Sequence, residues 1–242
     1  MNFCNLATDF DGTLAEDGGV ARSTIRALEA FRRSGRSIIL VTGRELAQLL
    51  EIFDRPEIFD WIVAENGALL YHPATARKHL LTEPVPLHFV EELKRRGVSP
   101  ISTGEAVVAT WRPHENIVLE VIRDLGLELQ IALNKDAVMV LPVGVDKAGG
   151  LAAALKEMKL SWKNVAGIGD AENDIAFLRK CACSAAVSNA LDSVKAQVDF
   201  TTRAPRGEGV VELIQEILKD DLRSRCRIQP EGAMATTSKP RS

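Results

Sequence analysis

The sequence predicts an α/β protein with a mainly parallel sheet, interrupted by an inserted α+β domain. Short unbroken apolar runs alternate with amphipathic segments over residues 1–66, a pattern typical of buried parallel strands joined by helices. The pattern changes after Gly67, where helices and paired strands follow one another, and the first rhythm resumes at Asp146. We therefore expect a core of residues 1–67 and 145–220, an α+β cap of residues 68–144 and a disordered tail of residues 221–242.

The first part of the core contains three expected strands and two expected helices. The apolar runs at residues 3–8, 37–42 and 61–64 have the length of buried strands and are too short for helices. Apolar residues at helical spacing predict the two helices between them, the first closed by Gly35 and the second extending to Phe53. Strands separated by helices predict parallel pairing through crossover connections.

The insert and the second part of the core are read in the same way. Within the insert we expect two helices, at residues 87–96 and 117–125, and four strands, at residues 98–102, 106–111, 127–133 and 137–141. After it, alternation predicts strands at residues 165–168 and 184–187 among helices at residues 147–158, 173–180, 191–197 and 210–218. From residue 221 onward the apolar periodicity is lost, which is why a disordered tail is expected there.

Composition excludes several classes of protein. The chain has 242 residues, 46% apolar and 26% charged, with a formal net charge of −3, as in an ordinary globular protein. This charge creates no cationic field for nucleic acid or an anionic membrane, and no apolar run approaches the roughly 20 residues of a membrane span. The N-terminus lacks the charged start of a signal peptide. The four cysteines show no Cys-x-x-Cys spacing, and two of them lie in apolar surroundings that suit buried thiols of a reducing compartment, so we expect a cytoplasmic protein.

The strongest chemical signal is a pair of carboxylates at the end of the first expected strand. Asp9 and Asp11 belong to the segment DFDGTL, in which Gly12 lets the backbone turn sharply. Ligands of open α/β sheets bind at the carboxyl ends of the strands, so both carboxylates are expected to reach that crevice. Close like charges repel unless a divalent cation joins them, and hard oxygen ligands suit Mg²⁺. The simpler alternative is an acidic turn that caps a helix.

Two further segments offer groups suited to a phosphate. Thr42, Gly43 and Arg44 end the second expected strand, where a hydroxyl and backbone amides at a helix start can hold phosphate oxygens. Lys147 opens a helix in the second part of the core and can add a positive charge. The alternatives are a helix cap at Thr42 and a solvated surface lysine at residue 147.

A second acidic segment, GDAEND, follows the strand expected at residues 165–168. Asp170 and Asp174 are four residues apart, so they can share one face near a helix N-terminus, where a cation site is favoured. The alternative is a helix N-cap with a capping acid.

These segments together resemble the four motifs of the haloacid dehalogenase superfamily of phosphohydrolases, in the same order along the chain. The similarity extends from about residue 3 to residue 215, and residues 65–68, 187–190 and 207–210 resemble its Cof-type, or IIB, branch. That branch includes sugar phosphatases, sucrose-phosphatase, mannosyl-3-phosphoglycerate phosphatase, archaeal phosphoglycolate phosphatase and phosphomannomutase. The resemblance implies a Rossmann-like core with the cap inserted after the third core strand.

The resemblance also implies roles for individual residues. It makes Asp9 the nucleophile that forms an aspartyl-phosphate, Asp11 the general acid and base, and Thr42 and Lys147 the residues that hold the phosphoryl group. Mg²⁺ would be bound by Asp9, the Asp11 carbonyl and Asp170, with Asp174 counted in the metal set as a supporting residue. The expected substrate-binding set is Gly43, Arg44, Asn66, Arg112 and Asn173.

Arg112 is the one member of that set in the cap. It sits at a strand-to-helix turn, where it can bind a carboxylate or a second phosphate bidentately. The sequence favours the simpler alternative, in which Pro113 starts a helix and Arg112 is solvated. We therefore expect a Mg²⁺-dependent phosphatase acting on a small phosphorylated metabolite such as a sugar phosphate or a phosphoglycolate-like compound, with no nucleic-acid or membrane partner. A phosphomutase and a non-catalytic phosphate-binding module are the alternatives, and the oligomeric state is not predicted.

Overall fold

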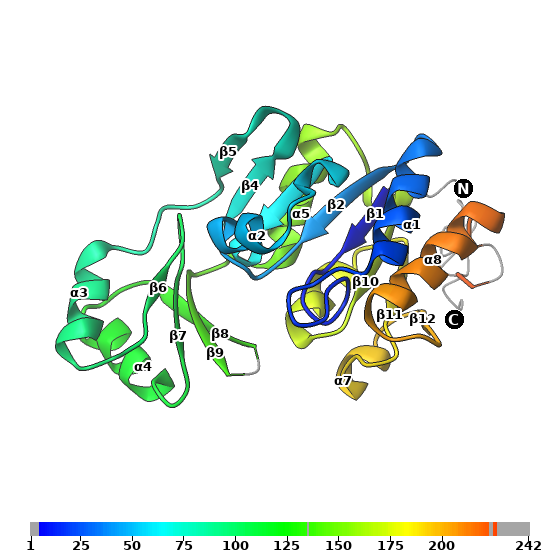
Figure 1. Ribbon diagram of the computed structural model, residues 1–242. Helices are drawn as coiled ribbons and strands as arrows, with labels where there is room; N and C mark the ends of the chain where they lie inside the picture. Colours follow the sequence, from blue (N-terminus) through cyan, green and yellow to red (C-terminus); the bar gives the residue numbers. More distant parts are fainter. Residues whose placement is uncertain (1–4, 135, 223–224, 227–242) are drawn as a thin grey trace, which may run out of the picture.

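The computed structural model describes residues 5–134, 136–222 and 225–226, which form a core and a cap (Figure 1). The core sheet has eight strands in the order β12-β11-β10-β1-β2-β3-β4-β5. Six of them are parallel: β1 (Asn5–Thr8), β2 (Ser37–Val41), β3 (Trp61–Ala64), β10 (Val165–Gly169), β11 (Cys183–Ala186) and β12 (Phe200–Thr201). The predicted fold class, a mainly parallel α/β core with an inserted α+β cap, is confirmed.

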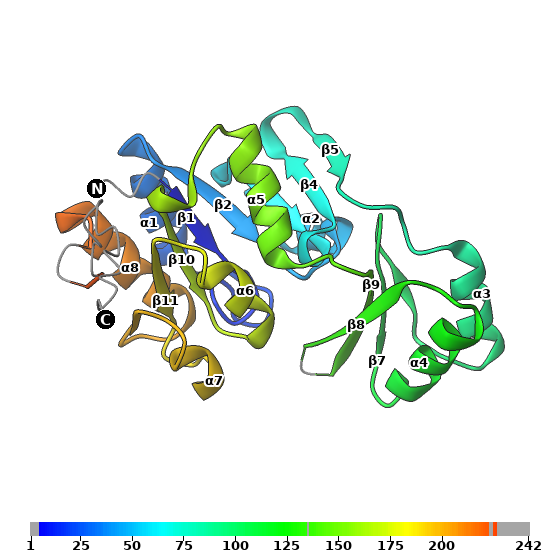
Figure 2. The same ribbon diagram turned by 180° about the vertical axis from the view of Figure 1, so that it is seen from behind.

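Helices cover both faces of this sheet. Figures 1 and 2, drawn from opposite sides, show α1 (Arg22–Arg33) and α8 (Arg206–Asp220) on one face and α5 (Lys147–Glu157) with α6 (Ile175–Leu178) on the other. The remaining core helices are α2 (Leu46–Ile52) and α7 (Asp192–Lys195). Burial on both faces explains why the central strands read as continuous apolar runs, since Ile38 to Val41 are all fully buried.

The core is larger than the sequence predicts, because its sheet continues past Gly67. Strands β4 (Leu69–His72) and β5 (Arg77–Leu80) lie within the expected insert, yet they pair antiparallel with β3 and with each other. Apolar β4 residues are buried against the core, whereas β5 is an exposed edge strand. Charged residues in β5 protect that edge from pairing with another chain. The cap therefore begins after β5, and the expected boundary at residue 68 is wrong.

The cap has its own sheet and its own apolar core. Its four strands, β6 (Ser102–Thr103), β7 (Val108–Trp111), β8 (Leu129–Asn134) and β9 (Ala137–Pro142), are antiparallel in the order β6-β7-β9-β8. Helices α3 (Leu87–Arg95) and α4 (Glu115–Asp124) cover one face through buried residues such as Phe89 and Val118. The other face carries a small apolar cluster, which includes Met139 and extends to Ala68 of the core.

The described residues that follow α8 contact the core. Leu222 is fully buried, and Asp221 pairs with Arg36 at 3.0 Å. Cys226 is joined by a disulfide to Cys183, with the Cα atoms 5.8 Å apart. The predicted disordered tail is therefore wrong at residues 221–222 and 225–226, and the rest of the tail lies outside the described residues. The disulfide also differs from the reducing compartment that the cysteines suggested in the sequence. No helix in the described ranges is long and apolar enough to cross a membrane.

Candidate active site

Four loops meet at the carboxyl end of the central strands. Asp9 follows β1, Thr42 follows β2 and Asp170 follows β10, while Lys147 opens α5 beside them. All four side chains are buried. Because β1 lies between β2 and β10, the parallel topology alone brings these residues, distant in sequence, to one edge of the sheet.

Lys147 joins two of the carboxylates. Its Nζ donates to Asp9 Oδ1 and to Asp174 Oδ1, each at 2.6 Å. Burial raises the pKa of Asp9 well above its ordinary value; the Lys147 charge opposes this shift, while the Asp174 and Asp170 charges add to it. Burial alone would lower the pKa of Lys147, but Asp174 and Asp9 outweigh it and raise that pKa, so the ammonium stays charged.

Asp174 supports the other residues of the cluster. Its Oδ2 accepts hydrogen bonds from the backbone amides of Asp170 and Ala171, both at 3.0 Å, and its Oδ1 is bound by Lys147. Both carboxylate oxygens are thus engaged by protein donors. This favours the supporting role over direct metal binding within the predicted metal set.

The glycine of the DFDGTL segment, Gly12, is required by its backbone conformation and by the close approach of Asp170. Its φ is +83°, and a Cβ at this position would collide with the Asp170 carboxylate. Thr13 Oγ1 donates to Asp170 Oδ1 at 3.0 Å, so the first acidic loop also orients the carboxylate of the second. A side chain at residue 12 would push these two loops apart.

The donor set fits a hard divalent cation. Oxygen atoms from Asp9, Asp170 and Asp174 lie within 4.8 Å of one another. Carboxylate oxygens at this spacing suit Mg²⁺, which is bound in proteins by one or two carboxylates together with water and phosphate oxygens. Asp9 and Asp170 would supply the side-chain ligands.

Arg44 has a partner that the sequence does not predict. Nε donates to Asp11 Oδ2 at 2.7 Å and Nη2 donates to Asp11 Oδ1 at 2.6 Å, a bidentate ion pair. Thr42 Oγ1 accepts from the Arg44 amide at 3.1 Å, which holds the start of this loop. Arg44 lines the cavity, but its guanidinium is bound to Asp11, whereas the sequence assigned it to the substrate.

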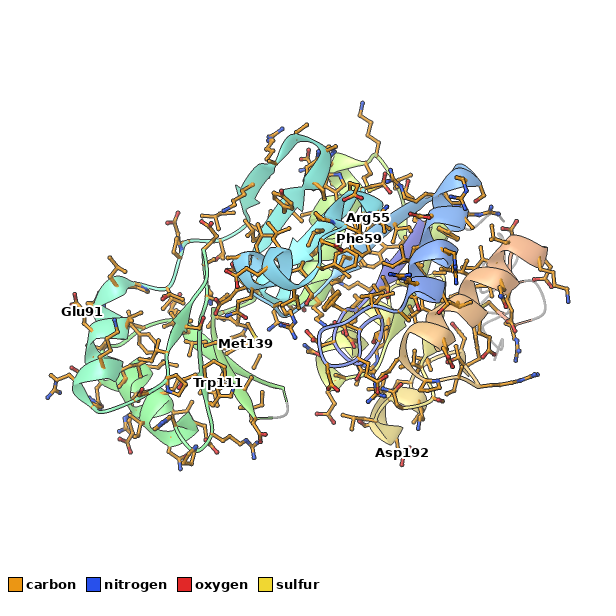
Figure 3. The ribbon with its side chains drawn as sticks, viewed as in Figure 1. Arg55, Phe59, Glu91, Trp111, Met139 and Asp192 are labelled. Atoms are coloured by element: carbon orange, nitrogen blue, oxygen red, sulfur yellow. A yellow bond between two sulfur atoms is a disulfide. The ribbon has the colours of Figure 1, made fainter. Side chains whose placement is uncertain are left out.

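Asn66 and Asn173 are brought together, but not both at the cavity. Asn173 Nδ2 donates to Asn66 Oδ1 at 3.1 Å, and Asn66 Nδ2 donates to Met139 Sδ of the cap at 3.0 Å. Figure 3 labels Met139 in the cap sheet. Asn66 is buried beside Gly43 and links the core to the cap, and it is not among the residues that line the cavity, whereas Asn173 is.

A cavity of about 850 Å³ opens between this cluster and the cap. Asp11, Arg44 and Asp170 line its core side, and Arg112 and Leu133 line its cap side. Arg112 directly follows Trp111, labelled in Figure 3, and it has no ion-pair partner among the residues that the structure describes. Arg112 therefore lines the cavity as a cation with no carboxylate bound to it in the described part of the chain.

Two residues of the cavity wall were not singled out from the sequence. Asn189 Nδ2 donates to the Gly12 carbonyl at 2.9 Å, and its Oδ1 accepts from the Arg206 amide at 2.8 Å. Arg206 pairs with Glu16 and has a left-handed φ of +47°. Residues 187–190, which contain Asn189, were singled out only for their resemblance to the family, and Arg206 lies just before the similar stretch at residues 207–210. An amide side chain after a buried strand is the signal that could have identified Asn189.

The fold and this cluster define an α/β protein of the Rossmann-like type, with an acidic, lysine-bridged site under an inserted cap. A family model described as haloacid dehalogenase-like hydrolase matches residues 6–108 and 131–214, and the chain belongs to this family. The resemblance of the four motifs to this superfamily is confirmed, as is the expectation of a hydrolase.

Several relatives match nearly the whole chain. A phosphoglycolate phosphatase of Nitrosopumilus maritimus is 26% identical over 226 residues, 88% of this chain and 95% of that protein. Phosphoglycolate phosphatase 2 of Saccharolobus solfataricus is 29% identical over 223 residues, covering 88% of this chain and 91% of that protein. Among solved structures, a Thermoplasma acidophilum protein has a TM-score of 0.77 at 18% identity, over 90% of this chain and 99% of that chain. A HAD subclass IIB sugar phosphatase has a TM-score of 0.70 at 22% identity, over 88% and 98%.

Proposed function

We propose that this protein is a Mg²⁺-dependent phosphatase that hydrolyses a small phosphorylated carboxylate through an aspartyl-phosphate on Asp9. The observation that carries the proposal is the buried Asp9–Lys147–Asp174 cluster, next to a cavity that Asp11 and Asp170 line on the core side and Arg112 lines on the cap side. The phosphatase names of its relatives support the reaction class.

The reaction has two steps in this proposal. Asp9 attacks phosphorus, the bond to the leaving oxygen breaks, and Asp11 gives that oxygen a proton. Water then attacks phosphorus, Asp11 takes its proton, and the bond to Asp9 breaks to release phosphate. Lys147 and Thr42 hold the phosphoryl oxygens in both steps, since phosphoryl transfer depends mainly on positioning and charge neutralisation. Mg²⁺, when bound, supplies positive charge that neutralises the phosphoryl oxygens.

Arg112 defines the leaving-group side of the cavity. A guanidinium without an ion-pair partner in the described part of the chain favours an anionic group on the substrate, and a carboxylate matches its two parallel donors. A phosphoglycolate-like molecule carries a phosphate and a carboxylate separated by one carbon. It suits a site that binds the phosphoryl group on the core side and has the Arg112 guanidinium on the cap side.

The test compares two substrates of similar size. The wild-type enzyme is expected to have a higher kcat/KM for 2-phosphoglycolate than for 2-hydroxyethyl phosphate, whose leaving group is neutral, and EDTA is expected to abolish both activities. Arg112→Met should lower kcat/KM for the acid by roughly 10- to 150-fold, the range for a lost hydrogen bond to a charged group, and leave the neutral ester nearly unchanged. Arg112→Lys, which keeps the charge, should fall between. Equal rates on both substrates would rule out the carboxylate subsite.

A further inference from the structure

The geometry points to Glu65 as a positioning residue that anchors the cap to the core and thereby sets the place of Arg112. Glu65 follows β3 and is fully buried. Its Oε1 accepts from the Glu105 amide at 2.9 Å and its Oε2 accepts from the Ala106 amide at 2.8 Å, both in the loop between β6 and β7. A core carboxylate is therefore bound on both oxygens by consecutive backbone amides of the cap.

The cap loop lies directly on this carboxylate. A Cβ at Gly104 would be 2.7 Å from Glu65 Cδ, so only glycine allows the loop to approach this closely. No lysine or arginine pairs with Glu65 within the described ranges, so the cap amides stabilise the buried negative charge. Because an unsatisfied buried charge is costly, the cap can rotate about this point but is not expected to separate from it.

On the core side, the same turn is tied to the catalytic loop. Glu65 and Asn66 have left-handed φ values of +55° and +54°, a strained conformation that persists only where the surroundings enforce it. The Glu65 amide donates to the Arg44 carbonyl at 3.0 Å, and the Asn66 amide donates to the Thr42 carbonyl at 3.1 Å. The anchor is thus fixed to the loop whose arginine binds Asp11.

On the cap side, strand β7 connects the anchor to the cavity. The strand begins at Val108, two residues after Ala106, and ends at Trp111, immediately before Arg112. A four-residue strand is a stiff segment of about 13 Å, and β7 is held by pairing to both β6 and β9. Displacement of the loop at residues 105–106 is therefore transmitted to Arg112.

Glu45 provides a matched control next to Glu65. It is also buried at the junction, but its cap partner is the Ser102 hydroxyl, at 2.7 Å. A hydroxyl can rotate to donate or accept, so Glu45→Gln keeps a hydrogen bond to Ser102. At Glu65 the partners are two fixed N–H donors, and the amide group of Glu65→Gln can accept only one of them.

The experiment measures selectivity and rests on the Arg112 subsite proposed above. Glu65→Gln should lower kcat/KM for 2-phosphoglycolate by at least tenfold, up to the order of 10²-fold that a displacement of about 1 Å can cause, and change that for p-nitrophenyl phosphate by less than about threefold. Glu45→Gln should leave both within about twofold. In the double variant Glu65→Gln/Arg112→Met, the loss for 2-phosphoglycolate should equal that of Arg112→Met alone, because Glu65 acts through Arg112. Multiplicative losses, or unchanged selectivity in Glu65→Gln, would overturn the proposal.

Amide exchange in the wild-type enzyme tests the anchor without any variant. The Glu105 and Ala106 amides should each exchange far more slowly than the same amide in free peptide. Exchange at the free-peptide rate would overturn the anchor even if Glu65→Gln does not fold. Failure of the subsite is separable from failure of the anchor. If the wild-type enzyme does not prefer 2-phosphoglycolate, the proposed function fails, and the exchange rates still decide whether Glu65 binds the cap.

Discussion

The guanidinium of Arg44 binds both carboxylate oxygens of Asp11, at 2.7 and 2.6 Å, across 33 residues of sequence. Asp11 is the residue proposed to move the proton, so this ion pair places it at the cavity, and one of its two oxygens must leave Arg44 before it can carry that proton. The arginine also lies over the Phe10 ring, 5.8 Å from its centroid, which limits its own movement.

We expect Arg44→Ala to slow hydrolysis of 2-phosphoglycolate more than hydrolysis of p-nitrophenyl phosphate. An alkoxide leaves poorly without a proton, whereas nitrophenolate leaves well, so only the first substrate depends on a well-placed Asp11. The loss in kcat should approach, but not exceed, the 10²- to 10⁴-fold contribution of general acid catalysis. Steady-state kinetics on both substrates measure it, and an equal loss on both would assign Arg44 to binding the phosphoryl group.

Substitutions of Asp9 and of Asp11 are expected to block different steps of the reaction. Asp9→Asn removes the nucleophile and should form no phospho-enzyme from any substrate. Asp11→Asn should release about one nitrophenolate per site from p-nitrophenyl phosphate and then stall with phosphate on Asp9, because water is no longer activated. Rapid quench with mass spectrometry reads the phosphorylated peptide. Turnover by Asp9→Asn, with no burst from Asp11→Asn, would exclude this assignment of roles.

The two aspartates of the GDAEND segment should separate metal binding from support. Asp170→Asn should raise the Mg²⁺ concentration for half-maximal activity by more than the 10- to 100-fold typical of losing an outer partner. Asp174→Asn should instead lower kcat and the melting temperature, because Lys147 and the 170–171 amides lose a carboxylate partner. Mg²⁺ titrations and thermal unfolding of both variants provide the comparison. Identical titrations would show that the two residues contribute equally to the metal site.

Glu45 should make the wild-type protein less stable as pH rises. Burial raises its pKa above the ordinary 4.5, with Glu65 adding to the shift and the Ser102 and Gln48 hydrogen bonds opposing it. The folded state therefore favours the protonated form, so stability is fully present below pH 4.5 and declines as pH rises through the folded-state pKa. The melting temperature of Glu45→Gln, relative to wild type, should increase between pH 4 and pH 7. A constant difference would contradict the raised pKa.

Leu222 should contribute to stability although it follows the last helix. Leu222→Ala removes a fully buried side chain and is expected to cost about 2–5 kcal/mol, whereas Leu218→Ala, at a half-exposed leucine of α8, should cost much less. Denaturant unfolding of the two variants measures the difference. Equal midpoints would show that the segment after α8 does not pack on the core.

The catalytic cluster could be predicted because its residues end parallel strands. Asp9, Thr42 and Asp170 each follow a short apolar run, and topology then forces them to one edge of the sheet. The partner of Arg44 could not be predicted, because many orientations of a long side chain are compatible with its place in the sequence. Only the packing of the folded protein decides whether the guanidinium points to Asp11 or to a substrate.

The misplaced start of the cap has a different cause. Residues 69–72 form a strand whose apolar side chains suit either sheet equally well. What assigns β4 to the core is the tight turn at Glu65–Gly67, which requires left-handed backbone at two residues that are not glycine. Asn66 and Gly67 suit this turn, because Asn and Gly favour left-handed backbone, whereas Glu65 does not. The contacts of Glu65 with the cap stabilise its conformation. Leu222 escaped prediction similarly, as a single apolar residue without periodicity.

The position of β1 in the middle of the sheet has a consequence for synthesis of the protein. One neighbour, β2, follows soon after it, but the register with β10 pairs Asn5 with Val165, so half of the catalytic pocket emerges from the ribosome long after the other half. Until β10 has been synthesised, the edge of β1 that pairs with it therefore stays open. The cap emerges in the interval, and because its contacts are local it can fold first and draw the two ends of its own segment together. The insertion that carries Arg112 thus also shortens the loop that the core must close to complete its site.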